Sequence, residues 1–249
     1  MRKKDGASAA AGSGVWSIRY IVKHLLRMKN VIVTGANGNL GQAVTGKLLE
    51  SGYRVHAVVR KESSRNELEP HPQLIIHTAD LSDEKAAHVA AEKILSQDQI
   101  HAVCLVAGGF AAGDIPSTTG DQLRLQLSQN FESAFYLCTR VLPHMLTHQY
   151  GRILFIGSRP ALEATAGRKM ADYGLSKSLL FKLAEYINAE GKSKNVTAAV
   201  IVPGTIDTPP NREAMPDADF SKWVSPEALA DIMHMVISDL GDPLREVVL

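Results

Sequence analysis

The chain has 249 residues and a formal net charge of +1, and 45% of its residues are hydrophobic. This size and apolar content suffice for one α/β domain with a continuous core. No run of basic residues interleaves with aromatic residues, so a nucleic-acid partner is not expected. No apolar run reaches the roughly 18 residues that a membrane span needs, so a membrane-spanning helix is not expected either. The two cysteines, Cys104 and Cys138, stand in apolar stretches, which predicts buried, reduced thiols in a cytoplasmic protein.

Residues 1–27 differ in composition from the rest of the chain. They carry six Lys or Arg residues against the single acid Asp5, and positions 7–14 hold only small residues. We interpret them as a flexible basic extension ahead of a domain at 28–249, since Met28 directly precedes the first predicted strand. A transit segment, which would place the protein in mitochondria, and an amphipathic surface anchor are the alternative interpretations.

From Asn30 onward, short apolar segments alternate with amphipathic ones. The apolar segments predict strands at 31–34, 55–59, 74–76, 102–106, 153–156 and 196–202, with an edge strand at 246–249. Helical periodicity predicts helices at 40–51, 83–96, 121–148, 173–189 and 226–238, the third broken near Gln129. Apolar strands without alternation are typical of a parallel sheet covered on both faces, so we expect a single-domain, doubly wound α/β fold of the Rossmann type.

A glycine-rich turn joins the first predicted strand to the first predicted helix. Its glycines suit, in chain order, a tight turn (Gly35), the approach of backbone to a pyrophosphate (Gly38) and close packing of helix on strand (Gly41). The N–H groups at the start of the helix would face the phosphates. In this strand–turn–helix context the motif predicts a dinucleotide site, to which we also assign Asn37, Asn39 and Leu40.

The second predicted strand ends at Arg60, which is followed by Lys61. This position touches the adenosine ribose in dinucleotide folds, where an acid favours NAD and a base favours NADP. The guanidinium of Arg60 can hold a 2′-phosphate with a fork of N–H donors. The sequence therefore favours NADP, with NAD as the alternative cofactor. Asp80, after the third strand, is a candidate contact for the adenine, or else a helix cap.

Tyr173 and Lys177 stand four residues apart within a predicted helix, so their side chains share one face. A neighbouring ammonium stabilises a phenolate and lowers the pKa of the tyrosine from its usual value near 10. Such a pair suits a general acid that protonates a carbonyl oxygen as hydride arrives at the carbon. On an arbitrary helix the same spacing would be an ordinary surface pair, and the preceding dinucleotide motif is what favours the catalytic interpretation.

Two histidines, His144 and His148, stand four residues apart near the end of the third predicted helix, as metal ligands can. No Glu follows the first of them, and positive side chains are favourable near a helix C-terminus in any case. We therefore predict no metal site.

These features together resemble the short-chain dehydrogenase/reductase family from about residue 28 to the C-terminus. The matching pieces are Thr34 to Gly41, Asp80, Ala107-Gly108-Gly109, Asn130, Ser158, Tyr173 with Lys177, and Pro203-Gly204-Thr205. The resemblance implies an NAD(P)-dependent oxidoreductase in which Tyr173 donates the proton and Lys177 binds the nicotinamide ribose. It further implies that Ser158 polarises a substrate carbonyl and that Asn130 supports a proton relay. The cofactor site would include Ala107, Gly108, Pro203, Gly204 and Thr205.

The resemblance also implies a small-molecule substrate and a homodimer or homotetramer formed through helices at 129–148 and 173–189. Within the family, the stretches 106–110 and 206–223 are similar to dihydropteridine reductases. Those enzymes usually lack the catalytic serine and commonly carry an acid where this chain has Arg60. We therefore expect a carbonyl or alcohol substrate, with a quinonoid dihydropterin as the alternative. The alternative from another functional class is a non-catalytic sensor that binds NADP. The presence of Tyr173, Lys177 and Ser158 argues against it, because a sensor does not need a proton donor.

Overall fold

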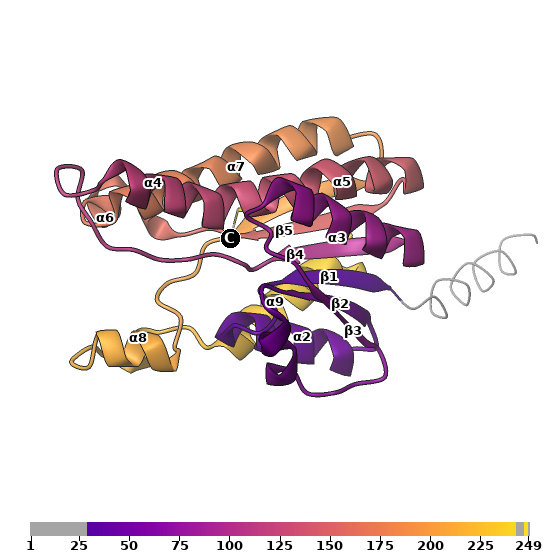
Figure 1. Ribbon diagram of the computed structural model, residues 1–249, viewed down its shortest axis with the longest axis horizontal. Coiled ribbons are helices and arrows are strands. Elements are labelled where there is room, and N and C mark those ends of the chain that lie inside the picture. Colours follow the sequence, from indigo (N-terminus) through magenta and orange to yellow (C-terminus); the bar gives the residue numbers. More distant parts are fainter. Residues whose placement is uncertain (1–28, 243–246, 249) are drawn as a thin grey trace, which may run out of the picture.

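The computed structural model describes residues 29–242 and 247–248 (Figure 1). The predicted basic extension at 1–27 lies outside the described residues. Seven described strands form one parallel sheet in the order β3-β2-β1-β4-β5-β6-β7. Their bounds are β1 Asn30–Thr34, β2 Arg54–Val59, β3 Leu74–Thr78, β4 Ile100–Leu105, β5 Gly151–Ile156, β6 Val196–Ile201 and β7 Val247–Val248. The predicted single-domain, doubly wound α/β fold is confirmed.

Helices cover both faces of this sheet (Figure 1). One face carries α3 (Glu84–Gln97), α4 (Gly120–Leu127), α5 (Ser133–His148) and α7 (Ala171–Gly191), and the other carries α2 (Asn39–Glu50) and α9 (Pro226–Ile237). Shorter elements are η1 (Glu62–Glu67), η2 (Ser128–Glu132), η3 (Arg159–Ala161), α6 (Ala164–Gly167), α8 (Pro209–Ala214), η4 (Phe220–Lys222) and η5 (Asp239–Gly241). No helix of the described residues is both long and apolar enough to cross a membrane.

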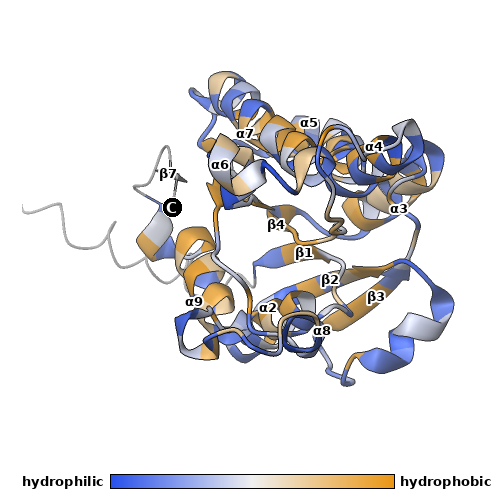
Figure 2. Cartoon of the chain, turned by 90° about the vertical axis from the view of Figure 1, so that its left-hand side faces the viewer, coloured by the Kyte–Doolittle hydropathy of each residue, from blue (hydrophilic) through white to orange (hydrophobic). Residues whose placement is uncertain are grey.

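The strands are mainly apolar because helices bury both faces of most of them, as the hydropathy colours show (Figure 2). On β1, for example, Ile32 packs into the core under α3, α5 and α7, whereas Val31 and Val33 pack into the core over α2 and α9. Both cysteines are buried and free, and burial raises the pKa of each thiol to about 12. The parallel packing brings the carboxyl ends of all strands to one edge of the sheet.

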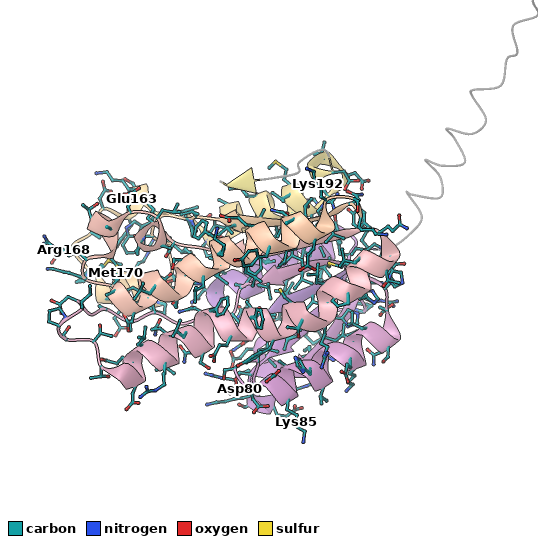
Figure 3. All side chains as sticks on the ribbon, turned by 90° about the horizontal axis from the view of Figure 1, so that it is seen from above. Asp80, Lys85, Glu163, Arg168, Met170 and Lys192 are labelled. Atoms are coloured by element: carbon teal, nitrogen blue, oxygen red, sulfur yellow. The ribbon has the colours of Figure 1, made fainter. Side chains whose placement is uncertain are left out.

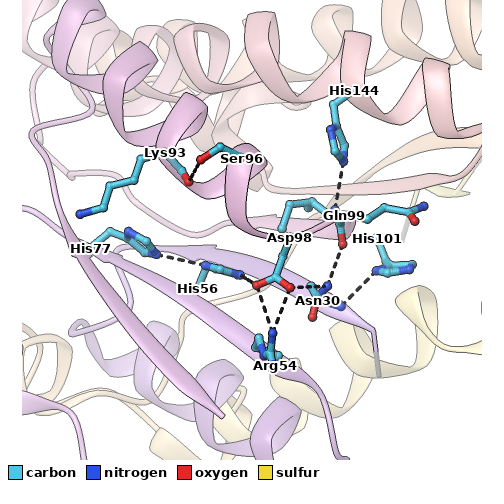
Figure 4. Close-up of polar contacts among 11 residues, drawn as sticks. Asn30, Arg54, His56, His77, Lys93, Ser96, Asp98, Gln99, His101 and His144 are labelled. Carbon is cyan, nitrogen blue, oxygen red and sulfur yellow. Dashed lines mark hydrogen bonds and ion pairs between the residues drawn. The ribbon is translucent and has the colours of Figure 1, made fainter. Parts of the chain in front are cut away.

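The opposite edge holds a buried polar network (Figure 4). His56 on β2 bonds through Nδ1 to Nε2 of His77 on β3 at 3.0 Å, and through Nε2 to Oδ2 of Asp98 at 3.1 Å. Arg54 donates from Nη1 to Oδ1 of the same carboxylate at 3.0 Å. Asn30 reaches Asp98 Oδ1 from β1 at 3.4 Å. The network joins the first residues of β1 and β2, and His77 near the end of β3, to Asp98, which directly follows α3.

Both histidines of this network bind protons weakly in the folded chain. Burial lowers the pKa of His56, although Asp98 acts in the opposite direction. For His77, burial and then the charges of His56, Lys93 and Arg65 lower the pKa to about 4. Both side chains are therefore neutral in the fold at neutral pH.

This arrangement predicts a loss of stability in mild acid. A histidine with a pKa near 6.5 when unfolded and a lower pKa when folded stabilises the fold fully only above pH 6.5. Its contribution is lost as the pH falls toward the folded pKa, which for His77 is about 4. At pH 5 the unfolding free energy should be lower than at pH 7.5 by about 2 kcal/mol from this residue.

His77→Gln, which keeps a hydrogen-bonding side chain but does not titrate, should reduce the difference in unfolding free energy between pH 7.5 and pH 5, as measured by urea denaturation. His71→Gln is the matched control, because His71 is exposed. An equal loss of stability in wild type and His77→Gln would show that His77 does not control this response.

Candidate active site

A cavity of about 400 Å³ opens where the strand order reverses between β1 and β4. Many of the predicted cofactor positions line it, namely Gly35, Asn37, Gly38, Asn39, Leu40, Gly41, Arg60, Asp80, Ala107 and Gly108. The predicted positions Lys177, Pro203, Gly204 and Thr205 do not contribute to its lining. Residues that sequence reasoning missed also line it: Val58, Ala79, Leu81, Ser82, Val106, Gln129, Ser133, Ile206 and Asn211. Thr208 lines it as well. Several of these sit at or just after strand ends, which is the signal that could have identified them.

The glycine turn has the backbone that its sequence predicts. Gly35 has a φ of +62°, and a Cβ atom there would lie 2.8 Å from the Cα of Ala107. A Cβ at Gly41 would lie 2.1 Å from the carbonyl oxygen of Gly35, so only glycine lets α2 approach the turn this closely. The N-cap of α2 is Gly38, and no side chain caps the helix. Its first N–H groups are therefore free of a competing side chain, which fits a dinucleotide phosphate.

Thr34 joins the turn after β1 to the turn after β4. Its hydroxyl oxygen accepts hydrogen bonds from the backbone N–H groups of Val106 and Ala107, each at 3.1 Å. The turn is also held to β2, since the N–H of Ala36 donates to the carbonyl of Val58 at 3.3 Å. These bonds place the glycine turn beside the residues that follow β2 and β4.

Arg60 and Asp80 form an ion pair at one end of the cavity. Nε of Arg60 lies 3.2 Å from Oδ2 of Asp80, and Oδ1 of Asp80 accepts from the N–H and the hydroxyl of Ser82 at 3.0 and 2.5 Å. Partial burial acts to raise the pKa of Asp80, but the Ser82 bonds and the Arg60 charge hold it below its usual value. Asp80 thus orients Arg60 and fixes the following turn. Within the described chain, the two Nη atoms of Arg60 make no hydrogen bond or ion pair.

The predicted break near Gln129 is a π-helical turn, η2, between α4 and α5. It directs the buried side chain of Asn130 toward the loop after β4, where Oδ1 accepts from the N–H of Gly109 and Nδ2 donates to its carbonyl, both at 3.0 Å. Nδ2 also lies 3.0 Å from Oε1 of Gln126 and 3.1 Å from Oγ of Ser176. Single π-turns inside helices are frequent at functional sites. Here the turn places the side-chain amide of Asn130 within hydrogen-bonding distance of α4, α7 and the loop after β4.

Lys177 is buried, and its Nζ donates to the carbonyl oxygen of Ile156 at 2.9 Å. Burial lowers its pKa to about 8. A Cβ atom at Gly108 would lie 2.5 Å from Oδ1 of Asn130 and 3.3 Å from Nζ of Lys177, so both groups border this residue of the cavity wall. The structure therefore brings the predicted lysine and asparagine together beside the dinucleotide cavity.

The ammonium of Lys177 lies 5.9 Å from the centre of the Tyr173 ring. The expected lowering of the tyrosine pKa by this charge is wrong for the structure described: burial of the phenol raises the pKa of Tyr173. The hydroxyl of Ser158 opposes that rise from its place beside the phenol. Because Oγ of Ser158 is buried and makes no hydrogen bond of normal geometry with the described residues, it remains available for another partner.

Two loops carry clustered aromatic side chains, and Phe110 of the first loop borders Tyr173. Phe110 is 64% exposed and packs edge-on against Tyr173, with ring centres 5.1 Å apart. Phe220 packs against Trp223 at 4.7 Å, and the guanidinium of Arg212 lies 4.7 Å from the centre of the Phe220 ring. The segment between β6 and α9 is closed at its base by a bridge between Ile206 and Val224. Exposed aromatic surface therefore lies directly beside Tyr173.

The histidines at the end of α5 have structural partners. Nε2 of His144 accepts from the backbone N–H of Ile100 at 3.1 Å, and Nδ1 of His148 bonds to the carbonyl of His144 at 2.8 Å. Among the residues that the structure describes, no group of three or more His, Cys, Asp or Glu side chains is arranged to hold a metal ion.

The sequence matches a model of the short chain dehydrogenase family over residues 29–219. The 2-(R)-hydroxypropyl-CoM dehydrogenase of Xanthobacter autotrophicus is 28% identical over 188 residues, which cover 72% of this chain and 74% of that protein. The dihydropteridine reductase of Dictyostelium discoideum is 27% identical over 207 residues, which cover 82% and 85%. Relatives with different substrates thus share the same domain.

Solved structures show the same fold. An oxidoreductase of the short chain dehydrogenase/reductase family from Burkholderia thailandensis superimposes with a TM-score of 0.78 at 23% identity, covering 88% of this chain and 90% of that one. ElxO with NADP bound superimposes with a TM-score of 0.81 at 18% identity, covering 89% and 96%. Since the family match spans most of the described sheet and its glycine turn, the chain belongs to the short-chain dehydrogenase/reductase family and is an oxidoreductase.

Proposed function

We propose that the protein reduces a carbonyl group with NADPH. The observation that carries this proposal is the buried hydroxyl of Ser158, which lies beside the phenol of Tyr173 but makes no hydrogen bond of normal geometry with the described residues. A buried polar group without a partner is unfavourable, so a hydroxyl in this position suits a ligand oxygen that completes its hydrogen bonding. A carbonyl oxygen that gains negative charge during reduction is such a partner.

Tyr173 is the proposed proton donor. Its raised pKa keeps the phenol protonated at neutral pH, which suits donation to a substrate oxygen in the direction of reduction. Lys177, whose ammonium is held by the Ile156 carbonyl, supplies positive charge on the same side of α7. Asn130 fixes the loop after β4 against α7 and supports proton transfer from there.

The dinucleotide would lie in the cavity lined by the glycine turn, with its phosphates at the start of α2. Bound NADPH would supply the hydride. Arg60, oriented by Asp80 through Nε, has both Nη groups free for a 2′-phosphate. NADP is present in the structure of ElxO, whose fold this chain shares. Pro203, Gly204 and Thr205, which follow β6, are proposed to lie along the nicotinamide end.

A homodimer or homotetramer formed through α5 and α7 is part of this proposal. Large apolar side chains on these helices are exposed in the single chain, among them Phe135, Leu179 and Tyr186. Exposed apolar surface of this kind is typical of contacts between subunits. The cytoplasmic location expected from the sequence stays a prediction.

Tyr173→Phe removes the proton and keeps the ring. Because general acid catalysis typically contributes about 10²–10⁴-fold, kcat on a carbonyl substrate should fall by that order. The Kd for NADPH, measured by fluorescence titration, should stay nearly unchanged. Tyr136→Phe, which changes a tyrosine of α5 outside the cavity lining, is the matched control. Near-normal turnover by Tyr173→Phe would reject Tyr173 as the donor.

The proposed role of Arg60 predicts that NADPH binds more tightly than NADH. Arg60→Asp should weaken NADPH binding by about ten- to a hundredfold, because it replaces charge-assisted bonds with repulsion of the 2′-phosphate. NADH binding should change far less. Lys85→Asp on α3, close to Asp80 in Figure 3 but outside the cavity lining, controls for the change in net charge. Equal affinities for both cofactors in the wild type would contradict the assignment.

A quinonoid dihydropterin is the second candidate substrate. The exposed ring of Phe110 beside Tyr173 offers a flat heterocycle a stacking surface, and the chain is 27% identical to a dihydropteridine reductase. Ser158 favours the carbonyl substrate instead, because its hydroxyl suits an oxygen that develops negative charge.

Values of kcat/KM for a panel of aldehydes and ketones and for a quinonoid dihydropterin should favour the carbonyl compounds. Ser158→Ala should then lower kcat on the best carbonyl substrate by about a hundredfold or more, as loss of one oxyanion donor does. Pterin reduction that survives Ser158→Ala, without carbonyl activity, would make Ser158 structural and the pterin the substrate. Tight NADPH binding without turnover of either class would identify a sensor.

A further inference from the structure

The segment that follows β2 returns to the glycine turn and bonds to it. Nδ2 of Asn37, in the turn, donates to Oε2 of Glu67, at the end of η1, at 3.0 Å. Asn37 lines the dinucleotide cavity, whereas Glu67 does not. Because the N–H of Ala36 donates to the carbonyl of Val58 on β2 at 3.3 Å, this contact lies at the end of the cavity that Arg60 borders.

The position of Glu67 is fixed by anchored neighbours on both sides. Leu68, the next residue, is 7% exposed and packs into the core over α2 and α9. Two residues before Glu67, Nη1 of Arg65 donates to the carbonyl oxygen of Ile76 on β3 at 2.9 Å. The carboxylate of Glu67 is therefore held beside the glycine turn by the fold of η1 and not by Asn37 alone.

The carboxylate of Glu67 decides which way the amide of Asn37 faces. An ionised carboxylate only accepts hydrogen bonds, whereas a side-chain amide has a nitrogen that donates and an oxygen that accepts. The nitrogen of the Asn37 amide therefore has to face Glu67, as the structure shows. Oδ1 of Asn37 accepts no hydrogen bond from the described residues, so it is a free acceptor on a residue of the cavity wall.

An acceptor on this wall distinguishes the two nicotinamide dinucleotides. The adenosine ribose of NADH carries a 2′-hydroxyl, which can donate to an oxygen, whereas that of NADPH carries a 2′-phosphate, whose oxygens accept. To bind the phosphate, the Asn37 amide would have to turn its nitrogen toward it and its oxygen toward the Glu67 carboxylate. Glu67 makes no ion pair with the described residues, so its negative charge also opposes the phosphate.

We propose that Glu67 is a second specificity-determining residue for the cofactor, which acts through the amide of Asn37 and against Arg60. Arg60 favours the 2′-phosphate of NADPH, and Asn37, as oriented by Glu67, favours the 2′-hydroxyl of NADH. The preference of the wild type for NADPH is then smaller than Arg60 alone would give. This inference rests on the proposed dinucleotide site but not on the proposed reduction of a carbonyl group.

The test measures the Kd of NADPH and of NADH by fluorescence titration. Glu67→Gln should lower the Kd of NADPH by about three- to tenfold, the range of one hydrogen bond, because glutamine can donate as well as accept and lets the Asn37 nitrogen turn toward the phosphate. The Kd of NADH should not fall. Adenosine 2′,5′-bisphosphate and adenosine 5′-monophosphate, measured by isothermal titration calorimetry, should show the same contrast, since they carry only the adenosine end.

Glu69→Gln removes the same charge from an exposed position close by, and as the matched control it should leave the ratio of the two Kd values near that of the wild type. In an Asn37→Ala background, Glu67→Gln should change this ratio far less, because the amide through which Glu67 acts is missing. Thermal unfolding of each variant checks that the fold is kept.

The proposal would be overturned if Glu67→Gln changed the Kd of both cofactors equally, which would give Glu67 a merely structural role. It would also be overturned if Glu67→Gln left the ratio unchanged, if its effect were the same without Asn37, or if Glu69→Gln had an equal effect, which would identify net charge as the cause. All of these outcomes concern binding, so they are distinct from a failure of the proposed reduction. Equal affinities in the wild type would reject the role of Arg60, and the change caused by Glu67→Gln would still decide the role of Glu67.

Discussion

The site depends on one constraint, the reversal of strand order between β1 and β4. The connections that follow these two neighbouring strands lead to opposite faces of the sheet, so a crevice opens between them. The hydroxyl of Thr34 spans this point by accepting from the backbone of Val106 and Ala107. Gly35 allows the turn to lie against Ala107, and Gly41 allows α2 to lie against the turn, at distances that a Cβ atom would prevent. The crevice is consequently walled by backbone, which suits a phosphate-bearing ligand.

The π-turn between α4 and α5 positions the groups that are proposed to react. It gives Asn130 a direction that a regular helix would not, and the amide then binds both polar groups of the Gly109 backbone. Through Ser176, whose hydroxyl donates to the carbonyl of Tyr173 at 2.8 Å, the same amide reaches the helix that carries the proposed proton donor. The loop after β4 and the start of α7 are thereby held in fixed relation. Preorganisation of this kind removes reorganisation from the catalytic step.

The pKa shifts of Tyr173 and Lys177 are caused mainly by burial and not by pairing with an opposite charge. Removing Lys177 and Tyr173 from water disfavours the charged form of each, so the lysine pKa falls and the tyrosine pKa rises. The hydroxyl of Ser158, which makes no hydrogen bond of normal geometry with the described residues, is a further polar group held away from water. Such groups are unfavourable for the fold and are typical of sites where a ligand supplies the missing partner. The buried histidines at the other edge of the sheet differ, because Asp98 and Arg54 complete a network there.

The sequence by itself determined the class of fold, the order of its elements and the dinucleotide turn. Apolar runs, helical periodicity and glycine spacing are local properties, and each records the burial or backbone shape that its own segment requires. Only the tertiary structure decided how Arg60 is used and which pKa shift Tyr173 has. The first depends on Asp80, which arrives from another strand, and the second depends on burial by loops distant in the chain.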